Sequence, residues 1–272
     1  MEKNTYPVES WKVTEKKFLK EWNYRNETTF ALSNGYIGTR GTFDEGYPFT
    51  VDEGLEGNFI NGFYESENIR YGEWNFGFPK KSQSLLNLPN LKKTTLIFDD
   101  EPFDLFTGEI KEYERSLLME DGEVIRNVYW KSPKGKEVKV TFKRLVSFSD
   151  KNLMGIQIKF TPLNFSGKVK INSFFDGAVE NHTSTTNPLI DYGPYGKHLI
   201  PRGLDVKGDT LIYEAEVKNN KFTMACGSVC KCGGKITDKD IQEETAVVTY
   251  QLDVTENEEY AFEKIIAYSS DL

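Results

Sequence analysis

The chain has 272 residues, enough for one large domain or two small ones with a full hydrophobic core. Its 34 basic and 42 acidic side chains give a net charge of −8. Because no basic block interrupts this acidic balance, the sequence argues against nucleic acid and against an anionic membrane as partners. Aromatic residues make up 14% of the chain, a richness typical of strands and of sugar-stacking surfaces. We expect most of them to fill a β core.

Neither a signal peptide nor a membrane segment is evident in the sequence. Residues 1–6 have no apolar run after their charges, and no stretch approaches the roughly 18 apolar residues of a membrane helix. The three cysteines, an odd number, cannot form a closed set of disulfides. We therefore expect a cytoplasmic protein.

Two kinds of segment precede residue 100. Residues 14–25 carry Phe18, Leu19 and Trp22 at helical spacing, which predicts a short helix or an irregular arm. Residues 25–100 are rich in glycine, asparagine and aromatic residues, a composition that excludes a regular helix. This stretch predicts short strands joined by tight turns and long shaped loops.

Strands at regular intervals follow residue 94. Apolar and polar residues alternate in the segments 94–98, 123–131, 137–148, 153–160, 168–175, 210–217, 221–229, 245–254 and 260–269. Alternation over so many segments indicates antiparallel sheets with one buried face. The number of strands exceeds that of a small immunoglobulin-like module, so we predict an all-β fold, a large antiparallel β-sandwich with few short helices.

A cysteine cluster, Cys226, Cys230 and Cys232, is the nearest approach to a metal-binding motif. Zinc sites usually combine two closely spaced ligand pairs, which this spacing does not provide. We favour the interpretation that these small side chains belong to a strand and its following turn. We expect no metal and no organic cofactor.

The two histidines, His182 and His198, flank a loop-like segment, and Glu180 is close by in sequence. Two histidines and a carboxylate on a large β-sandwich would suit an aldose epimerase, with a histidine as acid and a glutamate as base. We favour the simpler interpretation of two exposed loop histidines. A stand-alone aldose epimerase stays open as an alternative function.

Trp74, Phe76 and Phe78 alternate along the chain, which would place their rings on one face of a strand. Such a face would be able to stack on sugars, so a stand-alone carbohydrate-binding module is a second alternative. We favour the interpretation that these rings cover the core.

Residues 27–46, ETTFALSNGYIGTRGTFDEG, form the most specific stretch of the sequence. The stretch resembles the N-terminal signature of the family 65 glycoside hydrolases and phosphorylases, which include maltose, trehalose and kojibiose phosphorylases. Further similar strings follow in the same order at residues 57–65, 86–90, 98–105, 117–130, 142–150, 161–167 and 175–181. The resemblance therefore spans nearly the whole chain.

The resemblance implies a galactose mutarotase-like β-sandwich over residues 1–272, followed in family members by a helical linker and an (α/α)6 barrel. In those proteins the barrel supplies the general-acid glutamate and the phosphate pocket for inverting phosphorolysis of α-linked glucosyl disaccharides. This chain leaves no room for a barrel, so we expect no catalytic residue and no activity from it alone. The implied partners are the disaccharide, phosphate as co-substrate, the barrel and, since family members are often dimers, a second copy.

The resemblance further implies that the glycine-rich segment, residues 34–65, faces the barrel near the mouth of the active site. The residues that we expect to face the barrel or the substrate are Asn34, Gly35, Arg40, Asn58 and Tyr64. For Arg40, an alternative is that it braces its own loop. The segment is also rich in aromatic residues: Phe43, Tyr47, Phe49, Phe59 and Phe63. In the isolated chain we therefore expect exposed apolar surface, mobility or self-association there.

Overall fold

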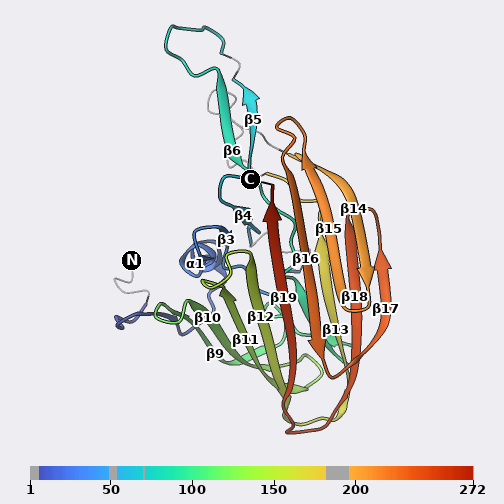
Figure 1. The fold of residues 1–272 in the computed structure, drawn as a ribbon. Coiled ribbons are helices and arrows are strands. Elements are labelled where there is room, and N and C mark those ends of the chain that lie inside the picture. The colour runs from blue at the N-terminus through green and yellow to red at the C-terminus, as the bar shows by residue number, and fades with distance from the viewer. Residues whose placement is uncertain (1–5, 49–53, 70, 182–195, 272) are drawn as a thin grey trace.

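A computed structural model of the protein describes residues 6–48, 54–69, 71–181 and 196–271. Two antiparallel sheets dominate the fold (Figure 1). The large sheet contains, in spatial order, β1 (Lys12–Glu15), β9 (Glu109–Leu118), β10 (Glu123–Lys131), β11 (Glu137–Val146), β12 (Leu153–Pro162), β19 (Tyr260–Ser270), β16 (Thr223–Cys232), β15 (Thr210–Val217) and β14 (Leu199–Lys207). The small sheet contains β17 (Lys235–Ile241), β18 (Thr245–Val254), β13 (Gly167–Asp176), β7 (Thr94–Phe98) and β8 (Glu101–Pro102). The predicted all-β sandwich is confirmed.

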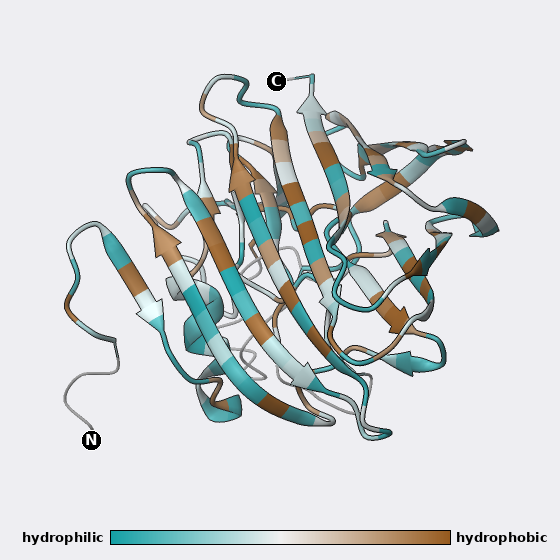
Figure 2. Ribbon diagram, turned by 90° about the horizontal axis from the view of Figure 1, so that it is seen from below, coloured by the Kyte–Doolittle hydropathy of each residue, from teal (hydrophilic) through white to brown (hydrophobic). Residues whose placement is uncertain are grey.

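The strands form because their side chains alternate between a buried and an exposed face. Along β11, Val138, Val140 and Phe142 are buried, while the residues between them are more exposed. Figure 2 shows the same alternation as teal and brown bands along the strands of the large sheet. The hydrophobic pattern thus sets the register, since a slip by one residue would turn every apolar side chain toward water.

Aromatic rings fill the space between the two sheets. Phe98 of the small sheet lies 5.7 Å from Phe160 and 6.5 Å from Trp130 of the large sheet, measured between ring centroids. All three side chains are fully buried. Burial of each such side chain stabilises the fold by about 1.5–3 kcal/mol, so this cluster is a main source of cohesion between the sheets.

The first hundred residues supply the remaining elements. These are η1 (Lys20–Trp22), α1 (Asn23–Thr29), a three-stranded sheet of β2 (Leu32–Ser33), β3 (Ile37–Thr39) and β4 (Asn58–Ile60), and a hairpin of β5 (Tyr64–Asn68) and β6 (Lys81–Leu85). We call residues 23–48 and 54–63 the loop layer. It contacts β9, β10, β11 and the β11–β12 connection of the large sheet, and the hairpin projects beyond one end of the sheet (Figure 1).

Two sequence predictions need correction. Residues 14–25, expected to form a short helix or an irregular arm, contain the end of strand β1, the 3-10 helix η1 and the start of α1 at Asn23. Strands β9, β14 and β17 were not expected: β9 and β17 carry many charges, and a register shift interrupts β14 between Pro201 and Gly203. In the described residues, no helix is long and apolar enough to cross a membrane.

Candidate functional site

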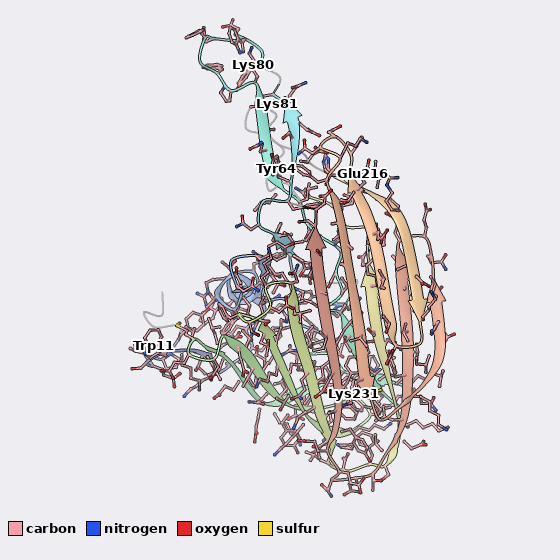
Figure 3. All side chains as sticks on the ribbon, in the orientation of Figure 1. Trp11, Tyr64, Lys80, Lys81, Glu216 and Lys231 are labelled. Atoms are coloured by element: carbon pink, nitrogen blue, oxygen red, sulfur yellow. The ribbon has the colours of Figure 1, made fainter. Side chains whose placement is uncertain are left out.

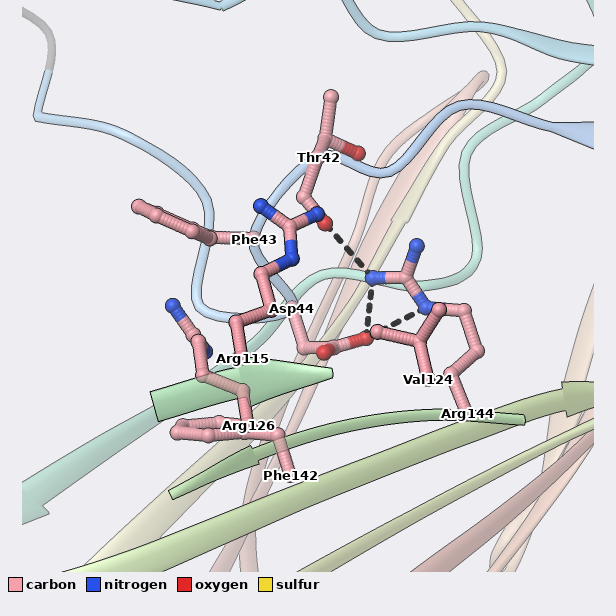
Figure 4. Close-up of a pocket in the computed structure, with 8 residues that line it drawn as sticks. All are labelled: Thr42, Phe43, Asp44, Arg115, Val124, Arg126, Phe142 and Arg144. Carbon is pink, nitrogen blue, oxygen red and sulfur yellow. Dashed lines mark hydrogen bonds and ion pairs between the residues drawn. The ribbon is translucent and has the colours of Figure 1, made fainter. Parts of the chain in front are cut away.

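Three arginines of the large sheet form hydrogen bonds with residues 41–45 of the loop layer. They project from the neighbouring strands β9, β10 and β11 and are all buried: Arg115, Arg126 and Arg144. Arg144 donates to Asp44 Oδ1 from Nη2 at 2.5 Å and from Nε at 3.0 Å, and to the Thr42 carbonyl at 2.8 Å (Figure 4). Arg126 Nη1 donates to Glu45 Oε1 at 2.8 Å, and Arg115 donates to the Gly41 carbonyl.

The space among these arginines is too small for a substrate. The cavity that they line with Thr42, Phe43, Asp44, Val124 and Phe142 measures about 10 Å³, which is room for about one water molecule at most. Burial raises the pKa of Glu45, while the Arg126 guanidinium opposes that rise. This cluster is therefore a structural brace for residues 41–45.

A third ion pair joins the loop layer to the segment just before β7 of the small sheet. Lys92 Nζ lies 2.5 Å from Glu56 Oε1 and also donates to Thr39 Oγ1 at 2.8 Å and Thr42 Oγ1 at 3.0 Å. Burial lowers the pKa of Lys92 to about 8. Burial also opposes ionisation of Glu56, but the ammonium outweighs it and holds the pKa of that carboxyl below its usual value. Both groups therefore carry their charges at neutral pH.

Glu27, in helix α1, binds three residues of the loop layer. Its carboxylate accepts hydrogen bonds from Tyr47 Oη at 2.5 Å and from the Leu55 amide at 2.9 Å, and it pairs with Arg40 at 3.2 Å. Burial raises the pKa of Glu27, and these three donors oppose the rise. Arg40 also donates from Nε to the Leu55 carbonyl at 2.7 Å. Glu27 of α1 thus links residues 40–47 to residue 55.

Gly41 is required at the closest approach of the loop to the helix. Its amide donates to the Glu27 carbonyl at 2.7 Å. A Cβ at this position would lie 2.6 Å from the carbonyl oxygen of Phe30, which is a steric clash with backbone. The glycine of the motif therefore lets the loop pass directly over the end of α1.

The predicted site residues all belong to the loop layer or its border, and each has a bracing contact. Asn34 donates from Nδ2 to the Ser147 carbonyl at 2.6 Å, and Gly35 turns with a φ of +89°. Asn58 is buried and accepts from Thr39 Oγ1 at 2.8 Å. Tyr64, at the start of β5, accepts at its carbonyl from Asn220. The structure therefore places four of these residues in the loop layer and Tyr64 at its border, and it supports the bracing interpretation of Arg40.

A cavity of about 290 Å³ opens above the loop layer. Arg40 contributes to its wall together with Leu55, Glu56, Phe59, Leu85, Asn87, Glu180 and Asn181. Several of its polar groups already bind one another: the Asn87 amide donates to Asn181 Oδ1 at 2.8 Å, and Asn87 Oδ1 accepts from the Asn58 amide at 3.0 Å. Among the sequence candidates, Arg40 and Glu180 line this cavity.

The expectation of exposed aromatic surface in residues 34–65 is wrong for the described part of the segment. Phe43 and Phe63 are buried, and Phe59 and Tyr47 are half-buried. Phe43 packs under the guanidinium of Arg126, and the Phe63 ring lies 6.5 Å from the Phe222 ring, measured between centroids. Phe49 lies outside the described residues.

The other sequence candidates lie apart from this layer. His198 is buried rather than exposed, with Nδ1 3.7 Å from Glu65 Oε2, and His182 lies outside the described residues. Cys226, Cys230 and Cys232 belong to strand β16, as expected, and their thiols are free. In the described ranges no three metal-binding side chains come together.

The aromatic residues Trp74, Phe76 and Phe78 do not cover the core, because they lie in the exposed segment between β5 and β6.

Sequence reasoning missed the residues that hold the layer together. Glu56, Lys92 and the three arginines are isolated charges in sequence, and nothing in their spacing marks them as partners. The usable signal was indirect: charges inside otherwise apolar strand faces, such as Arg126 and Arg144, need a buried counter-charge.

Comparison with known proteins identifies the family. The model of the glycosyl hydrolase family 65 N-terminal domain matches residues 13–272. An α,α-trehalose phosphorylase from Thermoanaerobacter brockii is 36% identical over 98% of this chain and 35% of its own length. A kojibiose phosphorylase from the same organism is 27% identical over 98% of this chain and 33% of its own length.

A solved structure shows the same fold. It belongs to a protein described as a kojibiose phosphorylase candidate from the human microbiome, and it superposes with a TM-score of 0.83 at 20% identity. The match covers 99% of this chain and 33% of that one. The chain therefore spans about a third of the length of each of these three proteins. Its match over residues 13–272 shows that it belongs to the glycosyl hydrolase family 65 N-terminal domain family.

Proposed function

We propose that this chain is the non-catalytic N-terminal part of a phosphorylase that acts on an α-glucosyl disaccharide. The observation that carries the proposal is the loop layer, in which the family-like motif of residues 27–46 forms a rigid, internally hydrogen-bonded platform. A platform whose polar groups, in the part of the chain that the structure describes, bind one another is suited to supporting a neighbouring domain. The alternatives of an aldose epimerase and a carbohydrate-binding module are not favoured by the comparisons.

In the complete enzyme we expect inverting phosphorolysis. A carboxylic acid of the (α/α)6 barrel protonates the glycosidic oxygen while phosphate attacks the sugar from the opposite face, so a second catalytic carboxylate is not required. The loop layer, with Asn34, Gly35, Arg40 and Asn58, and the adjoining Tyr64 would lie against the barrel near the mouth of its active site. Phosphate is then a co-substrate, and no organic cofactor or metal takes part. The three free thiols suit a reducing, cytoplasmic location.

The proposal is tested with a fusion protein. Residues 1–272 replace the matched N-terminal third of the T. brockii trehalose phosphorylase, and phosphate-dependent cleavage of trehalose is measured for the fusion and for the 272-residue chain. We expect activity from the fusion and none from the chain alone. Phosphorolysis of trehalose, maltose or kojibiose at an enzymatic rate by the purified chain would refute the non-catalytic role, and a folded but inactive fusion would count against the platform role.

A further inference from the structure

The β5–β6 hairpin is an arm that reaches beyond both sheets. Its two strands pair only with each other in the described structure, from Tyr64 opposite Leu85 at the base to Asn68 opposite Lys81 at the far end. Figure 3 shows Tyr64 at the base of the arm, Lys81 further along it and Lys80 near its tip. An isolated two-stranded hairpin is marginally stable in water, so an arm of this kind needs support beyond its own ladder.

The tip of the arm is aromatic and ordered by its own contacts. Phe76 is 97% exposed, Trp74 55% and Phe78 42%. The Phe78 ring lies 5.0 Å from Tyr71, whose hydroxyl donates to the Pro79 carbonyl at 2.9 Å. Grouped exposed rings on a monomer mark an interaction surface, and tryptophan and tyrosine are enriched at the centres of such surfaces.

The base of the arm is fixed to the turn between β15 and β16. Asn220 Nδ2 donates to the Tyr64 carbonyl at 2.8 Å, and the Asn219 amide donates to Glu65 Oε2 at 3.0 Å. The Phe222 ring packs edge-on against Tyr64 at 5.5 Å. The turn therefore sets the direction in which the tip points.

The same turn also holds the end of strand β19. Thr223, three residues after Asn220, donates from its amide and from Oγ1 to the two carboxylate oxygens of Asp271, both at 2.9 Å. Figure 1 shows the C-terminal end beside the base of the hairpin. The longer relatives, which this chain matches as an N-terminal domain over about a third of their length, therefore continue from the base of the arm.

We propose that the aromatic tip, Tyr71, Trp74, Phe76 and Phe78, docks on the domain that follows β19 in the complete enzyme. This inference rests on the proposed function. A domain joined through a linker to the end of β19 is tethered near the arm, which raises its effective concentration there, whereas a second copy has no such advantage. The partner surface is an apolar pocket on that domain that takes at least the Phe76 ring.

Hydrogen exchange at residues 71–80 tests the docking separately from activity. The exchange of these amides, including the Phe78 amide that donates to the Asn75 carbonyl, is compared in the 272-residue chain and in the trehalose phosphorylase fusion. We expect exchange at least tenfold slower in the fusion, and we expect Trp74→Ser combined with Phe76→Ser to abolish the difference. Phe148→Ser, which changes a 75% exposed ring between β11 and β12, should leave it intact.

Equal exchange in both proteins would overturn the proposal, even if the fusion is active. A protected tip in an inactive fusion would support the docking and reject the catalytic assignment. Sedimentation of the 272-residue chain supplies a measurement that needs no fusion. A monomer is expected at all concentrations, and a dimer that Trp74→Ser with Phe76→Ser dissolves, but Phe148→Ser does not, would show that a second copy is the occupant instead.

Discussion

Between the two sheets Phe98, Trp130 and Phe160 exclude water with aromatic rings, whereas the loop layer meets the same large sheet through the side chains of Arg126 and Arg144. The first contact is non-directional and tolerates changes of shape at moderate cost. The second contact depends on charge pairs that were removed from water, and each pair is stable only while both partners are present. Apolar packing thus stabilises the sandwich, whereas the directional charge pairs fix the conformation of the loop layer.

A fully buried lysine is found beneath the loop layer and another in the sandwich, and the two ammonium groups have different polar partners. Lys92, under the loop layer, has a carboxylate partner and several oxygen acceptors. Lys264, on β19, donates to the Phe174 carbonyl at 3.3 Å and lies near Cys230. Burial lowers the pKa of both to about 8. The pair provides an internal comparison between a paired and a poorly paired buried ammonium.

The largest effect is expected from Trp130→Ala. The Trp130 side chain is fully buried against Phe98 and Phe103, and its indole nitrogen donates to the Thr107 carbonyl at 2.9 Å. The cavity and the lost contacts should reduce the free energy of unfolding by about 3–5 kcal/mol, measured by urea titration. The exposed Phe148→Ala is the control and should change it by less than about 0.5 kcal/mol. A small effect at Trp130 would mean that the rings do not carry the sandwich.

Lys92→Met comes next and tests the charged region. The substitution leaves the Glu56 carboxylate without its ammonium beneath the loop layer, although 28% of that side chain stays exposed to water. We expect a loss of about 2–4 kcal/mol, less than the full cost of orphaning a buried charge because water reaches Glu56. Lys92→Met combined with Glu56→Gln should recover part of the loss. If the double variant is less stable than the single one, the ion pair is not the source of the effect.

The sequence predicted these two regions unequally, for a physical reason. Alternation along β10, β11 and β12 reports local burial, so their positions followed from the pattern. The charge pairs of the loop layer join residues far apart in sequence, such as Arg144 and Asp44, and no local period encodes them. The site residues followed from a family resemblance, which located the layer but did not reveal that Glu27 and Lys92 hold it.

The aromatic tip was misread for a related reason. Alternation of Trp74, Phe76 and Phe78 suggests a strand face over the core, but the segment is the end of a projecting hairpin. Hydrophobic residues indicate that something covers them and do not indicate whether the cover belongs to the same domain. A sequence pattern therefore cannot separate core from interface without the position of the strands.

Lys264→Met should have the opposite sign to Lys92→Met. The folded pKa of Lys264 is about 8 and its ordinary value is 10.5. Between these two pKa values the unfolded chain binds more protons than the folded chain, so the free energy of unfolding of the wild type should rise with pH. The free-energy cost of burying the Lys264 ammonium is therefore complete below pH 8. Methionine removes the penalty, and we expect a gain of roughly 1–3 kcal/mol at pH 7 that shrinks by pH 10. Urea titrations from pH 7 to 10 provide the measurement. A variant that is less stable than the wild type at pH 7 would show that the buried ammonium is well solvated by its neighbours.

The smallest effect is expected from Asn34→Ala, which tests the hydrogen bonds of a turn in the loop layer without changing its buried ion pairs. Asn34 Oδ1 accepts from the amides of Tyr36 and Ile37 at 3.0 and 2.9 Å, and Nδ2 donates to the carbonyls of Ser147 and Lys151. Because Asn34 is only half-buried, water can replace part of the lost hydrogen bonding, and the cost should be only about 1 kcal/mol. Asn34→Asp keeps the two acceptor contacts that shape the turn and loses the donor contacts to the β11–β12 connection, so it should cost about half as much. Urea titration of both variants, with Asn75→Ala at the exposed tip as a control, checks this order. Equal losses for alanine and aspartate would show that the link to Ser147 and Lys151, rather than the turn, holds this corner of the layer.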